Sequence, residues 1–323
     1  MLRDHWYALL ESREVPAGRP VGVTRLDRRM VFWRGPDGVV RCVHDCCCHR
    51  GASLAAGELR GGGVACPFHG FVHQGDGRVS LIPANGRAAP VGDQYRVEAW
   101  PVREAHGFIW LWFGEDREEL PPLPFFEDLA EPGWSWGSAV DDWPIHYTRA
   151  MENQLDVVHL PFVHRRSIGR GVGTVVHGPL VRQQGVSIRF WVQNVQDDGQ
   201  VVAKRPDQIG QEDAGVELEF RFGNVWQNKL GPKFRVMLAF VPVDADNTRI
   251  YLRVYQRFVT VPLIAGLVNW VANIFNLRIL REDKAVVLTQ QPRRTHLKMG
   301  EKLIPGDMPI VAFRRYRAER LGE

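Results

Sequence analysis

Five cysteines, the only ones in the 323-residue chain, lie close together in sequence among several histidines. Two short motifs, HDCCCHRGA and CPFHG, contain residue types that bind metals: Cys46, Cys47, Cys48, His49, Cys66 and His69. Neighbouring side chains on an irregular loop point in different directions, so three adjacent thiols cannot all reach one ion. Each motif can still contribute one thiolate and one imidazole, and either Cys46 or Cys47 can be the partner of His49.

Two thiolates and two imidazoles suit two kinds of metal centre. A structural zinc ion binds all four ligands in one tetrahedron. A Rieske [2Fe-2S] centre instead has two thiolates on one iron and two imidazoles on the other. The spacing of the ligands alone does not exclude zinc. Clustered cysteines differ from the spread pairs of a secreted disulfide framework, so they indicate metal binding in a reducing compartment.

A second group of polar residues lies in the largely apolar motif ENQLDVVHLPFVH. Asn153, Asp156 and His159 are spaced by three residues, which places them on one slowly drifting face of a helix. Pro161 interrupts this helix, so we expect His164 to arrive from a new turn. Unpaired polar groups are costly among apolar neighbours, so we interpret these residues as a site rather than as an ordinary helix surface.

A carboxylate that can complete such a site lies in the motif NLRILREDKAVVLTQQP. The helical neighbours of Asp283 are all apolar: Ile279, Leu280, Val286 and Val287. Burying this carboxylate without a cation would be expensive, whereas Glu282 lies four residues after Arg278 and can form a solvated pair. We therefore predict that Asp283 faces the site. The alternative is a structural network in which Asp283 is paired with a cation.

Alternating apolar residues and turn motifs predict the elements that carry these residues. The N-terminal part reads as β-structure, with a hairpin at RGPDG and further strands up to Gly114. An acidic, proline-rich stretch, residues 115–134, follows and marks a boundary. Beyond it we expect a helical segment, four strand segments and a long helix ended by Pro292, in this order: 145–160, 186–195, 216–226, 234–243, 248–258 and 262–291.

The order of these elements predicts an α+β protein. An all-β domain, residues 1–115, is followed by a domain with an antiparallel sheet and helices, residues 116–323. The sequence contains no internal repeat. Each domain contains one of the two groups of candidate metal ligands.

The segment 259–277 is apolar over about the length that spans a bilayer. Pro262 interrupts it, and Asn269, Asn273 and Asn276 form a polar stripe on one helical face. We interpret the segment as an amphipathic helix that covers a core. A helix on a membrane surface is the alternative.

Charge and the N-terminus bear on partners and location. Basic residues exceed acidic ones by 41 to 37, a net charge of +4 without a long basic block. Such a mild excess favours an acidic protein partner over nucleic acid. The N-terminus shows no apolar region of a signal peptide, so we expect a cytoplasmic protein that is not embedded in a membrane.

The cysteine and histidine motifs strongly resemble the Rieske motif, C-x-H followed by C-x-x-H, in which each histidine leads into glycine. The resemblance implies a [2Fe-2S] cluster with four ligands: Cys47, His49, Cys66 and His69. Cys48 stands where the family commonly has proline, and Phe71 where it often has tryptophan. We interpret Cys46 and Cys48 as loop thiols that do not bind the cluster.

The second domain resembles the catalytic domain of Rieske non-heme iron oxygenases through N-x-x-D-x-x-H-x-x-x-x-H and D-x-x-x-x-x-x-Q-Q-P. The resemblance implies a helix-grip fold and a mononuclear Fe(II) held by two histidines and one carboxylate: His159, His164 and Asp283. Asn153 and Asp156 are expected to act in catalysis without binding iron. Related enzymes form head-to-tail trimers, which implies that Asp156 connects His69 of one subunit to His159 of the next.

This resemblance implies an oxidoreductase that takes electrons from a ferredoxin or a flavin reductase and uses O₂. The single-subunit pattern resembles monooxygenases, so we expect a homotrimer that hydroxylates or oxidatively demethylates a hydrophobic or partly aromatic small molecule. A cis-dihydroxylating ring dioxygenase is the alternative enzyme. An electron-transfer or zinc-binding protein without oxygenase chemistry is the alternative from another class.

Overall fold

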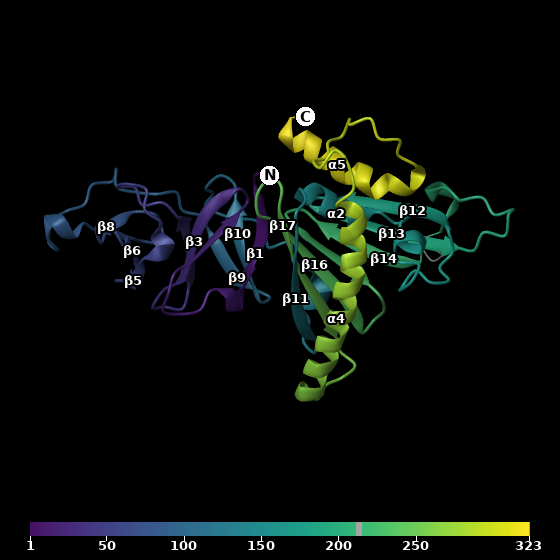
Figure 1. Ribbon diagram of the computed structural model, residues 1–323, viewed down its shortest axis with the longest axis horizontal. Helices are drawn as coiled ribbons and strands as arrows, with labels where there is room; N and C mark the ends of the chain where they lie inside the picture. Colours follow the sequence, from purple (N-terminus) through teal and green to yellow (C-terminus); the bar gives the residue numbers. More distant parts are fainter. Residues whose placement is uncertain (211–214, 323) are drawn as a thin grey trace. The chain divides into compact units, whose positions relative to one another are not determined.

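The computed structural model of the protein describes residues 1–210 and 215–322. The chain forms two compact units that divide between Leu123 and Pro124. This division lies inside the acidic, proline-rich stretch 115–134, a few residues beyond the boundary predicted at 115. The first unit is all-β and the second combines an antiparallel sheet with helices, so the predicted fold class is confirmed (Figure 1).

The first unit consists of three small antiparallel sheets. One has the order β1 (His5–Glu11), β10 (Phe108–Phe113) and β9 (Val102–Ala105). The second is the expected hairpin region, with β2 (Val21–Arg25), β3 (Arg28–Arg34) and β4 (Val40–His44). The third contains β5 (Glu58–Arg60), β6 (Gly63–Ala65), β7 (Val72–His73) and β8 (Val79–Leu81).

The loops that carry the cysteines are anchored by the core of this first unit. Cys47 and Cys66 belong to a buried cluster with Trp33, Leu54 and Phe71. The Trp33 indole N–H donates to the carbonyl of a neighbouring loop glycine, which satisfies the polar atom of a fully buried ring. The two thiols therefore sit on loops whose bases are fixed by packing.

The second unit is built on one seven-stranded antiparallel sheet. Its order is β11 (Ser135–Trp143), β17 (Thr248–Gln256), β16 (Phe234–Pro242), β15 (Val225–Lys229), β14 (Val216–Arg221), β13 (Ser187–Val195) and β12 (Val175–Gln184). Its helices are α1 (Glu127–Ala130), α2 (Tyr147–Leu155), α3 (Leu160–Val163), α4 (Pro262–Val287) and α5 (Met308–Leu321). The long helix α4 packs along β11 and β17, at one edge of the sheet (Figure 1).

The segment between α2 and α3 differs from the prediction of one continuous helical face. Helix α2 ends at Leu155, and Asp156 is extended, with φ −74° and ψ 123°. The Asp156 carboxylate accepts the backbone N–H groups of Val158 and His159 at 2.7 and 3.1 Å. The prediction that Asn153, Asp156 and His159 share one helix is therefore wrong, because Asp156 ends the helix and turns the chain.

The orientation of α4 also reverses the prediction made for its first half. Asn269 and Asn273 face the sheet and are buried, while apolar side chains such as Leu263 and Trp270 face outward. The interpretation of an apolar face on a core is wrong here, because Asn269 hydrogen-bonds Ser135 of β11. Among the described residues, α4 is the one helix that is long and apolar enough to cross a bilayer by length and composition.

Candidate metal centres

The two cysteine loops of the first unit have the same backbone geometry. In the first, the Cys47 N–H donates to Ala52 and the Cys47 carbonyl accepts from Gly51. In the second, the Cys66 N–H donates to Phe71 and the Cys66 carbonyl accepts from Gly70 in the same way. Both glycines have a positive φ, 74° and 73°, which favours glycine at these turns. This equivalence matches Cys47, rather than Cys46, with Cys66.

The four predicted cluster ligands lie together, with the thiols inside and the imidazoles outside. Cys47 and Cys66 are buried, whereas His49 and His69 are exposed and their ring centroids are 4.6 Å apart. Cys46 is half-buried and Cys48 is exposed. The ring of Phe71 stacks on the His49 ring, with their centroids 4.8 Å apart.

Electrostatics show that the two buried thiols suit a cationic centre. Burial raises the pKa of the Cys47 thiol to about 12, and the adjacent Cys66 contributes to the rise. Two neighbouring thiolates in this environment need strong positive charge between them, and iron supplies such charge. The residues therefore fit a [2Fe-2S] cluster with its histidine-bound iron toward solvent. The assignment of these four ligands stays a prediction.

A residue that sequence reasoning missed lies beside this cluster site. His73 is fully buried on β7, and its Nε2 lies 3.4 Å from the Cys47 sulfur. Burial lowers the pKa of the His73 imidazole to about 4. The signal in the sequence was the alternation after CPFHG, which directs Phe71 and His73 to the same side of a strand.

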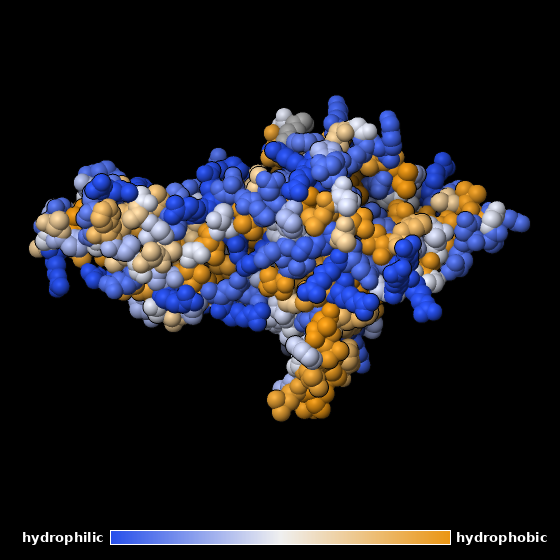
Figure 2. All heavy atoms as spheres, in the orientation of Figure 1, coloured by the Kyte–Doolittle hydropathy of each residue, from blue (hydrophilic) through white to orange (hydrophobic). Residues whose placement is uncertain are grey.

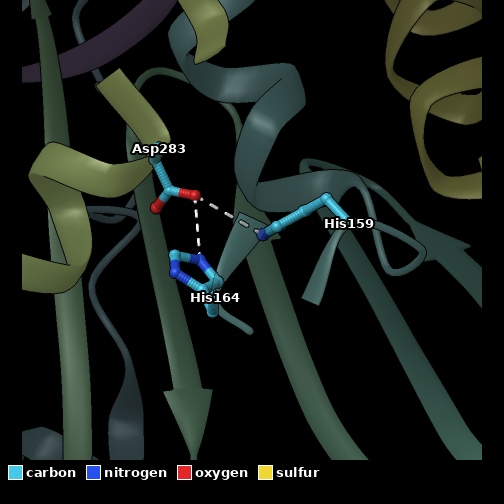
Figure 3. A group of neighbouring side chains, drawn as sticks. All are labelled: His159, His164 and Asp283. Atoms are coloured by element: carbon cyan, nitrogen blue, oxygen red, sulfur yellow. Dashed lines mark ion pairs between the residues drawn. The ribbon is translucent and has the colours of Figure 1, made fainter. Parts of the chain in front are cut away.

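The second unit brings the three predicted iron ligands to one point (Figure 3). Their candidate ligand atoms all lie within 4.8 Å of one another. One oxygen of Asp283 is 3.0 Å from His164 Nε2 and 3.5 Å from His159 Nε2. This oxygen is buried, and the described residues offer it no conventional hydrogen bond. Two imidazoles and a carboxylate converging in this way fit a mononuclear iron and leave other positions open.

Each of the two histidines has a second carboxylate behind it. His164 Nδ1 lies 2.8 Å from Glu282, which also accepts the Ser167 hydroxyl at 2.6 Å. His159 Nδ1 contacts the Asp156 carboxylate at 3.6 Å. Such partners fix the tautomer and the direction of a metal-binding imidazole.

Two sequence interpretations change at this point. The prediction that Glu282 forms a solvated pair with Arg278 is wrong, because Glu282 turns toward His164 and Ser167. Asn153 is not among the residues that line the site, and its side-chain nitrogen is buried without a hydrogen-bond partner in the described part of the chain. Its catalytic role stays a prediction. Gln154, which was not predicted, contacts Asp283 at 3.4 Å instead.

The neighbours of Asp156 favour the ionised form of its carboxyl group. Burial alone raises the pKa of Asp156, but His159 and the two backbone N–H groups outweigh burial and lower it. Asp156 can therefore accept hydrogen bonds at neutral pH without taking up a proton. Its side chain is about a third exposed, 31%, and it also lines the cavity beside the predicted iron ligands.

A cavity of about 650 Å³ opens beside the three predicted iron ligands. Its wall is mostly apolar and comes from the sheet and from α4, with Trp226, Leu238, Leu252, Phe275 and Leu280 among the lining residues. Asn194 and Asn228 are polar groups in the same wall. A cavity of this size and character suits a hydrophobic organic molecule with few polar groups.

Comparisons with known proteins agree with this geometry. Residues 5–101 match the Rieske [2Fe-2S] domain, and residues 143–323 match the vanillate O-demethylase oxygenase C-terminal domain. Chlorophyllide a oxygenase of Chlamydomonas reinhardtii is 34% identical over 98% of this chain and 48% of its own length. A vanillate O-demethylase oxygenase subunit of a Pseudomonas species is 36% identical over 45% of this chain and 43% of its own.

The fold is also shared with solved structures. Dicamba monooxygenase bound to dicamba has a TM-score of 0.76 at 21% identity, covering 99% of this chain and 97% of the other. NdmA of Pseudomonas putida CBB5 with caffeine has a TM-score of 0.77 at 20% identity, covering 99% and 91%. The matched part is about a third to a half of the length of the curated relatives. The chain belongs to the Rieske non-heme iron oxygenases, with the catalytic domain of the vanillate O-demethylase type.

Proposed function

We propose that the protein is a Rieske monooxygenase that hydroxylates or oxidatively demethylates a hydrophobic, partly aromatic small molecule. The observation that carries this proposal is the convergence of His159, His164 and Asp283 on one point at the wall of an apolar cavity. An electron carrier or a zinc scaffold has no need of a second ligand set beside a ligand-sized cavity.

The residues of the chain have separate roles in this proposal. Cys47, His49, Cys66 and His69 hold the cluster, which supplies electrons one at a time. His159, His164 and Asp283 would hold the iron, which would supply the activation of O₂. Glu282 and Asp156 orient the two iron-binding imidazoles, and the burial of His164 and Asp283 keeps bulk water from that side.

The substrate class follows from the cavity and from the relatives. The wall is dominated by aliphatic and aromatic side chains, so an apolar body is accommodated and its few polar groups meet Asn194 or Asn228. Two relatives carry O-demethylase and monooxygenase in their names. They support a monooxygenase over a ring dioxygenase.

Electron supply and assembly complete the proposal. The exposed His49 is available to an electron donor such as a ferredoxin or a flavin reductase, while His69 faces the neighbouring subunit in the proposed assembly. We place the protein in a homotrimer in which the cluster of one subunit serves the iron of the next. The partly exposed Asp156, in contact with His159, is the residue available to join two subunits.

Metal content and oxygen uptake test the function together. The protein loaded with iron and sulfide should contain three irons per chain, and O₂ uptake with a surrogate reductase should depend on a compound from a library of aromatic ethers and apolar ring compounds. Two irons per chain would indicate an electron carrier, and zinc without sulfide a scaffold. Mass analysis of the product distinguishes one added oxygen or a lost methyl group from a cis-diol.

Variants assign the two centres in the same experiment. Cys47→Ser should abolish the visible cluster spectrum, whereas the matched variants Cys46→Ser and Cys48→Ser should keep it. His159→Ala should lose one iron and turnover while the cluster spectrum remains. Retention of the spectrum in Cys47→Ser together with its loss in Cys46→Ser would reverse the ligand assignment.

A further inference from the structure

An apolar surface covers the tip of α4, which we define as residues 258–275. No charged residue occurs in it. Seven large side chains of the helix point outward: Leu263, Ile264, Leu267, Trp270, Val271, Ile274 and Phe275. Leu263 is 89% exposed and Trp270 is 62% exposed. Single exposed apolar residues are ordinary on a protein surface, but a contiguous row marks an interaction site.

The exposed row is fixed by the packing of the opposite face of the helix. Asn269 and Asn273 are buried against β11, where Asn269 donates to the Ser135 hydroxyl at 2.8 Å. Gly137 of β11 allows this close approach, because a Cβ there would lie 2.6 Å from the Asn273 side chain. Rotating the apolar face inward would break this hydrogen bond and place larger side chains against Gly137. Figure 2 shows the row as a continuous hydrophobic tip.

We propose that the α4 tip inserts into the surface of an anionic lipid bilayer, with the helix lying at the boundary between headgroups and acyl chains. Helices with Trp, Phe and Leu on one face bind membranes in this way. The inner face of α4 stays on the protein, so the helix docks on the membrane and does not span it.

The chemistry of the tip favours a bilayer over a second protein surface. A protein interface needs a partner surface whose shape matches the apolar row. Here the exposed row offers no charged group from Phe258 to Leu277, and the tip is a narrow projection that a fluid acyl layer can enclose without a matching cavity (Figures 1 and 2).

Basic residues flank the tip at both ends. At the start of the tip, the backbone N–H of Arg257 donates to the carbonyl of Lys233, so the exposed Lys233 lies beside Arg257. The side chain of Arg257 pairs with Glu131. Arg278 and Arg281 are exposed at the other end. Basic groups beside an inserted apolar face add attraction to anionic lipids.

The same surface leads to the proposed active site. Phe275 is half-exposed on the tip and also lines the cavity of the predicted iron ligands. Ile168, Val216 and Leu230 are further exposed apolar residues in the cavity wall. A lipid-soluble substrate can therefore pass from the bilayer to the cavity along an apolar surface. This last step rests on the proposed function; the docking surface itself does not.

Vesicle sedimentation tests the docking. The metal-loaded full chain should pellet with vesicles of phosphatidylcholine and phosphatidylglycerol, and more weakly with phosphatidylcholine alone. The double variant Leu263→Asp, Leu267→Asp should bind at least tenfold more weakly. Val202→Asp is the matched control, because Val202 is an equally exposed apolar residue, 81%, elsewhere in the second unit, and it should bind like the wild type. All three should show the same cluster spectrum and melting temperature.

Two results would overturn the docking proposal. One is a wild-type protein that stays in the supernatant with every vesicle. The other is self-association that light scattering detects without lipid and that the double variant abolishes, since a second copy would then cover the tip. Vesicle binding needs no turnover, so an active oxygenase that ignores vesicles contradicts only this inference, and a vesicle-bound protein without O₂ chemistry contradicts only the proposed function.

Substrate delivery has its own readout. For compounds that are turned over and that partition into lipid, vesicles should raise kcat/KM for the wild type and for Val202→Asp. They should not raise it for the double variant. An equal rise in all three proteins would show that lipid acts without the tip.

Discussion

Single residues next to the ligands set how the ligands behave, and His73 is the clearest case. Its imidazole is fully buried, and Nδ1 has no hydrogen-bond partner in the described part of the chain. Burying an N–H without a hydrogen-bond acceptor costs more than burying a nitrogen lone pair without a donor. The proton therefore belongs on Nε2, which lies 3.4 Å from the Cys47 sulfur. Hydrogen bonds to cluster sulfurs are one of the ways a protein sets the reduction potential.

We therefore predict that His73→Phe lowers the reduction potential of the loaded cluster. A reduced cluster carries more negative charge, so the N–H stabilises it more than the oxidised form. A hydrogen bond worth about 1 kcal/mol corresponds to about 40 mV for a one-electron couple. Redox titration followed by visible absorption measures the shift, with His177→Phe in the second unit as the control. An unchanged or higher potential at full cluster occupancy would contradict the prediction.

At the scale of single residues, the sequence predicted the candidate ligands well but predicted the residues that contact those ligands poorly. The motifs pointed to Cys47, but the equivalence of its loop with that of Cys66 depends on backbone hydrogen bonds that spacing does not reveal. Glu282 was misread because helical periodicity compares a residue only with its own helix. Its partners, His164 and Ser167, come from a segment more than a hundred residues away.

At the scale of elements, a buried ionic network joins α2 to α5. Glu152 of α2 accepts two hydrogen bonds from Arg314 of α5, at 2.8 and 2.7 Å, and one from the Thr295 hydroxyl. Glu301 pairs with both Arg149 and Arg314. The side chains of Glu152 and Arg314 are almost fully buried. This network holds the helix that leads into the predicted iron site.

We predict that Arg314→Met lowers the free energy of unfolding of the second unit by about 3 kcal/mol, because buried Glu152 loses both hydrogen bonds from Arg314 and keeps only the longer ion pair with Arg149, at 3.7 Å, and the Thr295 hydroxyl. Arg189→Met is the control: Arg189 is half-exposed in its pair with Glu217, and its loss should cost less than about 1 kcal/mol. Denaturant unfolding followed by tryptophan fluorescence measures both. Equal small losses in the two variants would show that the network contributes little.

The pH dependence of this network has a definite sign. Burial alone raises the pKa of Glu301, but the hydrogen bonds from Arg314 and Arg149 lower it below its ordinary value. A carboxyl whose pKa is lowered by folding stabilises the protein at neutral pH and loses this contribution as the pH falls through the lowered pKa. The deficit of Arg314→Met should therefore shrink in acid.

The long strands were the elements most open to prediction. Runs of apolar and β-branched residues placed β13, β16 and β17 within a residue or two, and β16 and β17 are buried on both faces. Helix α4 shows the limit, because a pattern of apolar and polar residues identifies two faces without saying which one meets the sheet. The small Gly137 and the Ser135 hydroxyl selected the asparagine face, and both lie far from α4 in sequence.

At the scale of the whole molecule, each unit holds one complete set of candidate ligands. The four cluster candidates lie in the first unit, and the three iron candidates lie in the second. The order of domains could be predicted because each motif stands inside its own pattern of strands or helices. The path of electrons between the two proposed centres could not, since one sequence does not show how copies of the chain would be arranged.

Mixed assemblies of two inactive variants test that path. Cys47→Ser lacks the cluster but keeps the iron site, and Asp283→Ala lacks the iron but keeps the cluster. If electrons pass between neighbouring subunits of a cyclic trimer, a cluster and an iron meet functionally wherever the two kinds of subunit adjoin in the right order. Every mixed trimer has one such junction out of three, so purified mixed assemblies should regain about a third of the wild-type rate per chain.

Co-expression of the two variants with different tags, followed by sequential affinity purification, isolates the mixed assemblies. Purified mixed assemblies should consume O₂ with substrate, while each variant alone stays inactive, and mixing the two after separate purification should restore activity only as fast as subunits exchange. If electrons instead pass only within one chain, the mixed assemblies should be inactive, because every chain in them lacks one of its own two centres. Mixed assemblies with both metals present and no turnover would place the transfer within a single chain and remove the role of Asp156 as a bridge between subunits.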